Sequence, residues 1–218
     1  MKRLPVILTT ALFSLCFVCG PANAQNLVGR WALGIDAGAN YWITDYNEYK
    51  VSFGGQLVVR YELARYFGLG LATGYEVLKT NQSTPLNPGA YASYMKVNAI
   101  PVSVVGFIHF FPRKMVNPYV YVGAGMLFYQ RTGVGTAPPV DGSWNTSYTV
   151  PVGFGIESFI NNDISIDGSV GFTMIGNDVD ARTTSSFKGY ASARIGLNFY
   201  LNEGQPHRQT PKPAPVRF

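Results

Sequence analysis

The sequence predicts an all-β protein, a closed antiparallel eight-stranded transmembrane β-barrel with short periplasmic turns and long extracellular loops. Two observations support this prediction. Apolar residues alternate with small or polar residues along eight segments, and short and long connections follow one another in turn between those segments. Alternation with a period of two is typical of strands whose two faces meet different surroundings.

Residues 1–24 have the composition of a signal peptide. Lys2 and Arg3 precede an uncharged apolar stretch, and Ala22-Asn23-Ala24 gives the small-x-small pattern of a cleavage site. Cys16 and Cys19, the two cysteines of the chain, both lie inside this segment. We therefore expect export into the envelope of a Gram-negative bacterium and a mature chain without disulfides or thiolate metal ligands.

The segments that follow residue 24 each read as one strand. In the clearest of them, residues 31–41, apolar Trp31, Leu33 and Ile35 alternate with Gly34 and Asp36. The other segments are 51–63, 67–77, 97–111, 119–129, 148–157, 164–174 and 190–201. Segment 97–111 is apolar on both faces, so the sequence leaves open which face points outward. We expect one face to carry Ile100, Val102, Val104, Ile108 and Phe110.

The connections alternate in length along the chain. Long or polar connections are expected at 44–50, 79–93, 131–146 and 175–188, and tight ones at 64–66, 112–117 and 161–163. Short turns at one end, longer loops at the other and an even number of strands are the layout of bacterial outer-membrane barrels, in which the short turns face the periplasm.

The two faces of the strands favour a membrane wall. The apolar face carries few charges, and the other face is mostly Gly, Ser, Asn and Thr with isolated charges, which suits a narrow polar lumen. Aromatic residues gather near both strand ends, as at the interfaces of a bilayer, although aromatic residues also favour strands in general. One group is Trp31, Tyr61, Phe67, Phe110, Tyr119, Phe159 and Phe199, and the other is Tyr41, Trp42, Tyr75, Tyr94, Phe128, Tyr129 and Tyr148.

The eight-segment pattern, the Ile100-Pro101 pair and the run from Pro118 to Gly125 resemble small OmpA-type outer-membrane barrels. The last segment is similar to the signal by which the barrel-assembly machinery recognises its clients, a polar residue, a glycine and two terminal aromatic residues. The matching positions are Arg194, Gly196, Phe199 and Leu201, where Leu201 departs from the aromatic pattern. The resemblance implies an outer-membrane location, contact with outer-membrane lipids and assembly by that machinery.

The chain divides into three parts on this interpretation. Residues 25–202 form the barrel and residues 203–218 a Pro-rich tail that cannot build a core. In OmpA-type proteins such a linker often leads to a peptidoglycan-binding domain, which we expect to be absent here.

Charged residues on the predicted lumen face are the main candidate site: Asp36, Arg60, Glu62, Glu76, Glu157, Asp167 and Arg194. An eight-stranded barrel is only wide enough for side chains to fill it, and buried charges need partners. We therefore expect salt bridges that plug the lumen. A narrow pore is the alternative, with a slight preference for cations because acids outnumber arginines.

Catalysis and cofactors have little support in the sequence. His109 stands without a recognisable catalytic partner, and the Gly-x-Gly pairs do not open a helix after a strand. Asp178-Val-Asp180 is at most a weak cation site. We expect neither an enzyme nor a cofactor nor a bound metal, and the small net charge of the mature chain gives no argument for nucleic acid.

Recognition, if any, is expected in the long loops. Tyr91, Trp144 and Phe187 are aromatic residues among Gly, Ser, Thr and Asn, a composition suited to adaptable binding of an extracellular ligand. The function expected first is a structural or surface-interaction role in the outer membrane. A narrow diffusion pore is the first alternative and a soluble periplasmic lipocalin-like binding barrel is the second.

Overall fold

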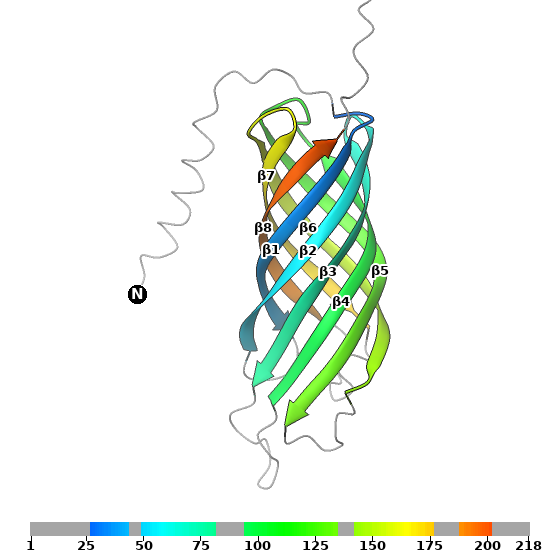
Figure 1. Ribbon diagram of the computed structural model, residues 1–218, viewed down its shortest axis with the longest axis vertical. Coiled ribbons are helices and arrows are strands. Elements are labelled where there is room, and N and C mark those ends of the chain that lie inside the picture. Colours follow the sequence, from blue (N-terminus) through cyan, green and yellow to red (C-terminus); the bar gives the residue numbers. More distant parts are fainter. Residues whose placement is uncertain (1–26, 44–48, 82–93, 135–141, 177–187, 202–218) are drawn as a thin grey trace, which may run out of the picture.

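Eight antiparallel strands form one closed sheet in the computed structural model, in which each strand pairs with its neighbours in sequence and β8 pairs with β1 (Figure 1). The structure describes residues 27–43, 49–81, 94–134, 142–176 and 188–201. The strands are β1 (Trp31–Ile43), β2 (Tyr49–Ala64), β3 (Phe67–Asn81), β4 (Tyr94–His109), β5 (Val116–Val134), β6 (Trp144–Phe159), β7 (Ile164–Ile175) and β8 (Gly189–Leu201). The predicted fold class is confirmed.

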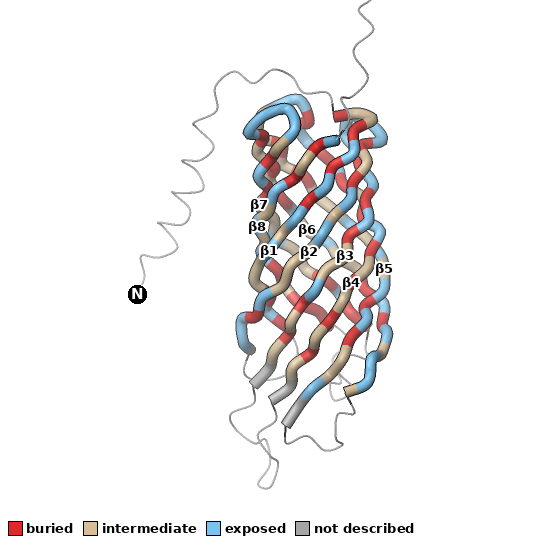
Figure 2. The backbone as a smooth tube through the Cα atoms, viewed as in Figure 1, coloured by how far each residue is buried: buried red, intermediate tan, exposed pale blue. Residues whose placement is uncertain are grey.

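Burial alternates residue by residue along the strands, as Figure 2 shows. In β2, Val51 and Phe53 are exposed on the wall while Ser52 and Arg60 are buried. Strand β4, whose orientation the sequence left open, places Val104 and Ile108 outward, and Phe110, directly after the strand, is exposed as well. Its inward positions include Val97 and Phe107, so the apolar residues on its second face serve the interior.

The ring closes through β1 and β8 in continuous register. Trp31 lies opposite Leu201 at one end and Ile43 lies opposite Gly189 at the other. On its other side β1 pairs with β2, from Trp31 opposite Tyr61 to Tyr41 opposite Val51. Every strand therefore has two partners and the sheet has no open edge, as a hydrocarbon surrounding requires.

Three tight connections gather at one end of the barrel, at 65–66, 110–115 and 160–163 (Figure 1). Asn161 shapes the last of them, because its side-chain oxygen accepts hydrogen bonds from the backbone N–H groups of Asp163 and Ile164, both at 2.8 Å. The connection expected at 112–117 lies earlier, because Val116 and Asn117 already pair with Ser158 and Glu157 of β6.

Strands β3, β5 and β6 are longer than the alternation of apolar residues indicated. Lys79 pairs with Lys96, Arg131 pairs with Val97, and Trp144 pairs with Gln130. Backbone pairing continues past the apolar band because a partner strand is still present. The prediction that Trp144 belongs to a loop is therefore wrong: it opens β6.

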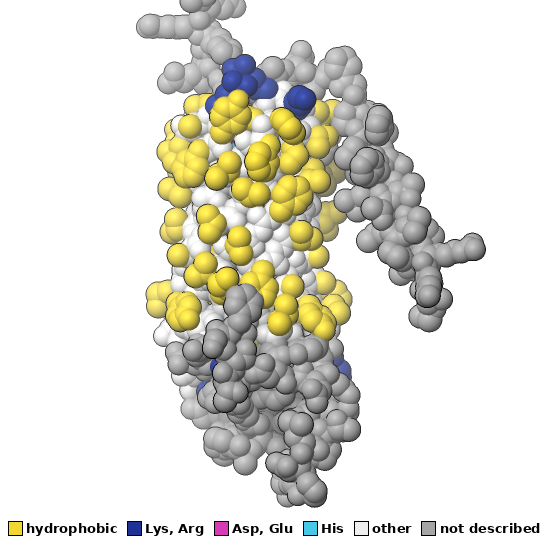
Figure 3. All heavy atoms as spheres, turned by 180° about the vertical axis from the view of Figure 1, so that it is seen from behind, with side chains coloured by type: hydrophobic (Ala, Val, Ile, Leu, Met, Phe, Trp, Pro, Cys, Tyr) yellow, Lys and Arg dark blue, Asp and Glu magenta, His cyan; other side chains and the backbone are white. Residues whose placement is uncertain are grey.

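The outer wall is apolar, and Figure 3 shows hydrophobic side chains over one face with Lys and Arg at the end that carries the tight turns. Exposed apolar residues lie on all eight strands, the reverse of a soluble lipocalin-like barrel, whose apolar face points inward. The two groups of aromatic residues predicted to lie at the membrane interfaces are partly confirmed, since Trp31, Phe67, Tyr75 and Tyr148 face outward. Four members face inward instead: Trp42, Tyr119, Tyr129 and Phe159.

Within the described part of the chain, no helix is long and apolar enough to span a membrane.

The apolar wall gives a prediction that depends on position along one strand. Leu57 and Leu63 are both exposed on β2, Leu57 in its central part and Leu63 next to its last residue. We expect Leu57→Arg to lower the free energy of unfolding by about 2–4 kcal/mol and Leu63→Arg by no more than about 1 kcal/mol, because the cost of a charge depends on its depth in the bilayer. Urea unfolding in lipid vesicles measures both variants, and equal losses would contradict the assigned wall.

Candidate functional site in the barrel lumen

Arg60 is the centre of a cluster of charges near the end that carries the tight turns. Its Nε lies 2.7 Å from Oε1 of Glu62 and its Nη2 lies 3.2 Å from Oε2 of Glu157. Nη2 also donates to the hydroxyl of Tyr200, and the guanidinium carbon lies 5.1 Å from the centre of the Phe107 ring. All five residues are buried, so the guanidinium replaces its hydration by contacts from several strands.

Glu157 is fully buried and well supplied with donors. Its Oε1 accepts hydrogen bonds from Ser165 Oγ at 2.6 Å, Tyr200 Oη at 2.7 Å and Asn198 Nδ2 at 2.8 Å. Since buried polar groups are costly only when they lack partners, this carboxylate is a stabilising element of the lumen.

His109 extends the cluster through Glu62. Its Nε2 lies 3.2 Å from Oε2 of Glu62, and its Nδ1 lies 2.8 Å from Nδ2 of Asn117. The side-chain oxygen of Asn117 accepts the N–H of Phe111 at 3.1 Å, so its amide nitrogen faces His109. Because that nitrogen donates to Nδ1, Nδ1 is the accepting nitrogen of the ring and Nε2 is the one that faces Glu62. His109 therefore packs directly beside the Glu62 carboxylate.

A second ion pair lies farther from the tight turns. Arg194 Nη2 and Glu76 Oε1 are 2.7 Å apart, and Asn40 Nδ2 donates to the other carboxylate oxygen. Gly54, on the neighbouring strand β2, makes this possible, because a Cβ at that position would collide with the Glu76 carboxylate and the Asn40 amide.

Asp36 and Asp167 line a cavity of about 60 Å³ together with Arg60 and Arg194. Both lie opposite Gly196, one on each side of β8, and a Cβ at Gly196 would collide with the Asp36 carboxylate. Asp167 accepts the Tyr119 hydroxyl at 3.0 Å through Oδ1, while its Oδ2 is buried without a hydrogen-bond partner among the described atoms. Neither carboxylate has an ion pair within the described ranges.

An apolar cluster fills the lumen on the side of the long connections. It consists of Trp42, Leu78, Val97, Ala99, Leu127, Tyr129, Ile175 and Tyr190, contributed by six strands. All alternate with wall residues and so point inward. The expectation of a polar lumen throughout is therefore wrong in this half of the barrel.

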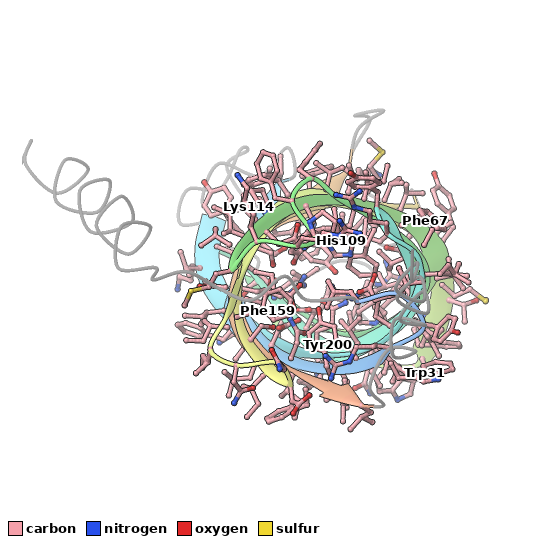
Figure 4. All side chains as sticks on the ribbon, turned by 90° about the horizontal axis from the view of Figure 1, so that it is seen from above. Trp31, Phe67, His109, Lys114, Phe159 and Tyr200 are labelled. Carbon is pink, nitrogen blue, oxygen red and sulfur yellow. The ribbon has the colours of Figure 1, made fainter. Side chains whose placement is uncertain are left out.

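The opposite end is covered by the segment that precedes β1. Leu27 is buried with Ala32, Phe159 and Tyr200. Arg30 reaches from this segment to the β6–β7 connection, where its Nη2 lies 2.6 Å from Oδ1 of Asp163 and its Nη1 donates to the Asn162 carbonyl at 2.5 Å. Seen from this end, His109, Phe159 and Tyr200 point into the lumen while Trp31 and Phe67 point away from it (Figure 4).

Comparison with known families decides what kind of barrel this is. The sequence model of the family described as outer membrane protein beta-barrel domain matches residues 10–188, most of the chain. The chain is a member of this outer membrane protein beta-barrel family. It is therefore a protein of the bacterial outer membrane. A comparison with curated proteins gave no match.

Solved structures of outer-membrane proteins share the family fold at low sequence identity. Neisserial surface protein A is 16% identical, with 78% of this chain and 96% of that chain covered and a TM-score of 0.50. Ail, the attachment invasion locus protein of Yersinia pestis, in complex with the heparin analogue sucrose octasulfate, is 13% identical, with 80% and 99% covered and a TM-score of 0.51. A major outer membrane protein from Thermus thermophilus is 10% identical, with 78% and 99% covered and a TM-score of 0.51.

The predicted site residues of this family member lie in several places. The seven charged residues share the lumen, but only Arg60, Glu62 and Glu157 form one cluster and Glu76 and Arg194 a second pair. Of the residues matching the assembly signal, Arg194 and Gly196 face the lumen and Leu201 the outside. Tyr91, Phe187 and Asp178-Val-Asp180 lie outside the described residues.

Sequence reasoning missed the contacts of Arg30, His109, Tyr119 and Tyr200. Tyrosines at inward positions of β5 and β8 were the available signal, because a buried Tyr hydroxyl needs a polar partner. Among the described residues, no group of three or more His, Cys, Asp or Glu side chains is placed to hold a metal ion.

The two kinds of lumen charge give contrasting predictions. Arg60→Met leaves Glu62 and Glu157 buried without their guanidinium, so the free energy of unfolding should fall by about 3–5 kcal/mol. Asp167→Asn removes a charge that lies opposite Glu157 and lacks an ion pair, so it should change stability by less than about 1 kcal/mol or raise it. Urea titration in vesicles compares the two variants, and a larger loss for Asp167→Asn would contradict the described pairing.

Proposed function

We propose that this protein is an outer-membrane barrel with a lumen closed to diffusion, and that it acts as a structural element or by contact at the cell surface. The apolar cluster around Trp42 supports the closed lumen most directly. Its members come from six strands, so they meet across the lumen. An ion that crossed this layer would lose most of its hydration to side chains that are largely apolar.

The remainder of the lumen agrees with this proposal. The cavity of about 60 Å³ is small beside the roughly 300–1,000 Å³ of cavities that hold a small molecule. The Arg60 cluster and the segment around Arg30 obstruct the path on the side of the tight turns. The narrow pore has one feature in its favour. The carboxylates of Asp36 and Asp167, which form no ion pair in the described part of the chain, would attract cations if a path existed.

The surface role follows from the orientation of the barrel. In outer-membrane barrels the short turns face the periplasm and the long connections face outward, which would expose the connections 44–48, 82–93, 135–143 and 176–188. We propose that an external ligand contacts these connections, with Tyr91 and Phe187 as candidates. The names of two proteins with this fold describe a surface protein and an attachment protein, so the fold is compatible with such roles.

Export and assembly form part of the same proposal. Residues 1–24 would direct secretion and be removed, and Arg194, Gly196, Phe199 and Leu201 would be recognised by the barrel-assembly machinery. β8 is the strand that closes the sheet onto β1, which supports a role for its sequence in the last step of folding.

A current measurement tests the closed lumen. Full-length protein in planar bilayers should show no steady current. The variant Trp42→Ala, Leu127→Ala and Tyr190→Ala should conduct when it is combined with Arg30→Ala and Arg60→Ala, because the combination empties the apolar layer and removes the obstruction on the side of the tight turns. The control variant Tyr41→Ala and Tyr148→Ala removes aromatic rings from the outer wall and should remain silent. A steady current from the unaltered protein would overturn the proposal in favour of a narrow pore.

Cysteine labelling tests the orientation, since both native cysteines lie in the predicted signal peptide. Ser143 precedes β6 at the end of the long connections, and Asn162 lies in a tight turn; both are exposed. A maleimide that cannot cross membranes should label Ser143→Cys on intact cells and should label Asn162→Cys only after the cells are broken. The reverse pattern would contradict the surface role.

A further inference from the structure

Three lysines occupy neighbouring positions on three adjacent strands. Lys50 of β2 lies opposite Lys79 of β3, and Lys79 lies opposite Lys96 of β4. The Cβ atoms of directly opposed residues in neighbouring antiparallel strands are about 4.5–5.5 Å apart. The register therefore places the Lys79 and Lys96 side chains next to one another on one side of the sheet, with Lys50 at the neighbouring position of β2 across a β-bulge.

That side is the outer wall. Lys79 follows Leu78 and Lys96 precedes Val97, and both of these apolar residues are fully buried in the lumen. Since successive side chains in a strand point to opposite faces, Lys79 and Lys96 point outward. Lys50 lies directly opposite Lys79 after a register shift and is exposed. The row lies at the end of the barrel opposite the tight turns, beyond the outward-facing Tyr75 of β3.

The protein supplies no anion for this row within its described part. None of the three lysines forms an ion pair with a described carboxylate, and the charged acids of the strands serve the lumen. Like charges that lie opposite one another destabilise a sheet. An anionic ligand from outside the chain would compensate these positive charges.

We propose that Lys50, Lys79 and Lys96 bind the phosphate groups of a phosphorylated glycolipid in the outer leaflet of the membrane. A lipid is favoured over a soluble anion because the row continues the wall of Tyr75 and Val77, whose surroundings are acyl chains. Lysine stems lie along apolar surface and carry the ammonium to the level of the headgroups. Clusters of basic residues near a membrane surface attract anionic lipids.

The proposal uses the orientation inferred above and is independent of whether the lumen conducts. If the short turns faced outward, the row would meet the periplasmic leaflet, and cysteine labelling detects that case. A current in planar bilayers, in contrast, would overturn the closed lumen and leave the lysine row unaffected. Failure of one proposal is therefore distinguishable from failure of the other.

The test compares full-length protein with two matched variants in phosphatidylcholine nanodiscs. The first is Lys50→Gln, Lys79→Gln and Lys96→Gln. The control is Arg65→Gln, Arg113→Gln and Lys114→Gln, which removes three exposed positive charges from the end with the tight turns. The probes are lipid A with two phosphates and the same lipid A after enzymatic removal of both, and a gel-mobility shift on heating verifies that each variant is folded.

We expect the unaltered protein and the control to bind bisphosphorylated lipid A about 100-fold more tightly than the first variant, at roughly fivefold per lysine. The unaltered protein should bind dephosphorylated lipid A weakly, with the affinity that the lysine variant has for the intact lipid. Lys→Arg at all three positions should preserve binding of the intact lipid. Equal binding by the lysine variant and the unaltered protein would overturn the site. Full competition by millimolar inorganic phosphate would overturn the assignment to a lipid.

Discussion

The pairing of β8 with β1 is the constraint on which the rest of the structure depends. In hydrocarbon no water can satisfy an unpaired backbone N–H or C=O group, so a sheet that spans the membrane must close on itself. Closure with eight strands leaves a lumen just wide enough for side chains. Every inward residue must therefore fit against residues from the opposite wall, and Arg60, Glu157, Glu76 and Arg194 find their charged partners there. Gly54 beside Glu76 and Gly196 beside Asp36 illustrate how little room the lumen leaves, because a Cβ at either position would collide with a carboxylate.

The lumen is built in layers that differ in chemistry. Near the tight turns, Arg30 and the Arg60 cluster connect strands that are distant in sequence. Arg194, which pairs with Glu76, lines the cavity together with Tyr190 of the apolar cluster. Ion pairs tie particular strands together and so favour one register, whereas the apolar layer excludes water. Together these layers make the interior resemble a protein core, which is why a role at the surface of the barrel fits the molecule better than passage through it.

The fold could be predicted from the sequence because alternation reports directly which residues face the same side. That information determined the strands, their closure into a barrel and the inward position of Arg60 and Glu157. Alternation does not report height along the barrel axis, which depends on the stagger between strands, so it could not distinguish the partners of Arg60 from those of Arg194. The grouping of aromatic residues by strand end was wrong for Trp42: Tyr41 faces the membrane and Trp42 faces the lumen, as alternation alone would place them. Strand ends were misplaced where polar residues such as Lys79 continue the backbone pairing.

The central claim is that the lumen is a packed interior in which charges act on one another without intervening water. A double-mutant cycle on Glu76 and Arg194, using Glu76→Gln and Arg194→Met with unfolding measured in lipid vesicles, tests it most directly. The cycle isolates the energy of this one pair from the other effects of each substitution. The structure predicts a coupling of at least about 1.5 kcal/mol, as for desolvated charge pairs. A coupling below about 0.5 kcal/mol, the range of solvated pairs, would show a water-filled lumen and contradict the account.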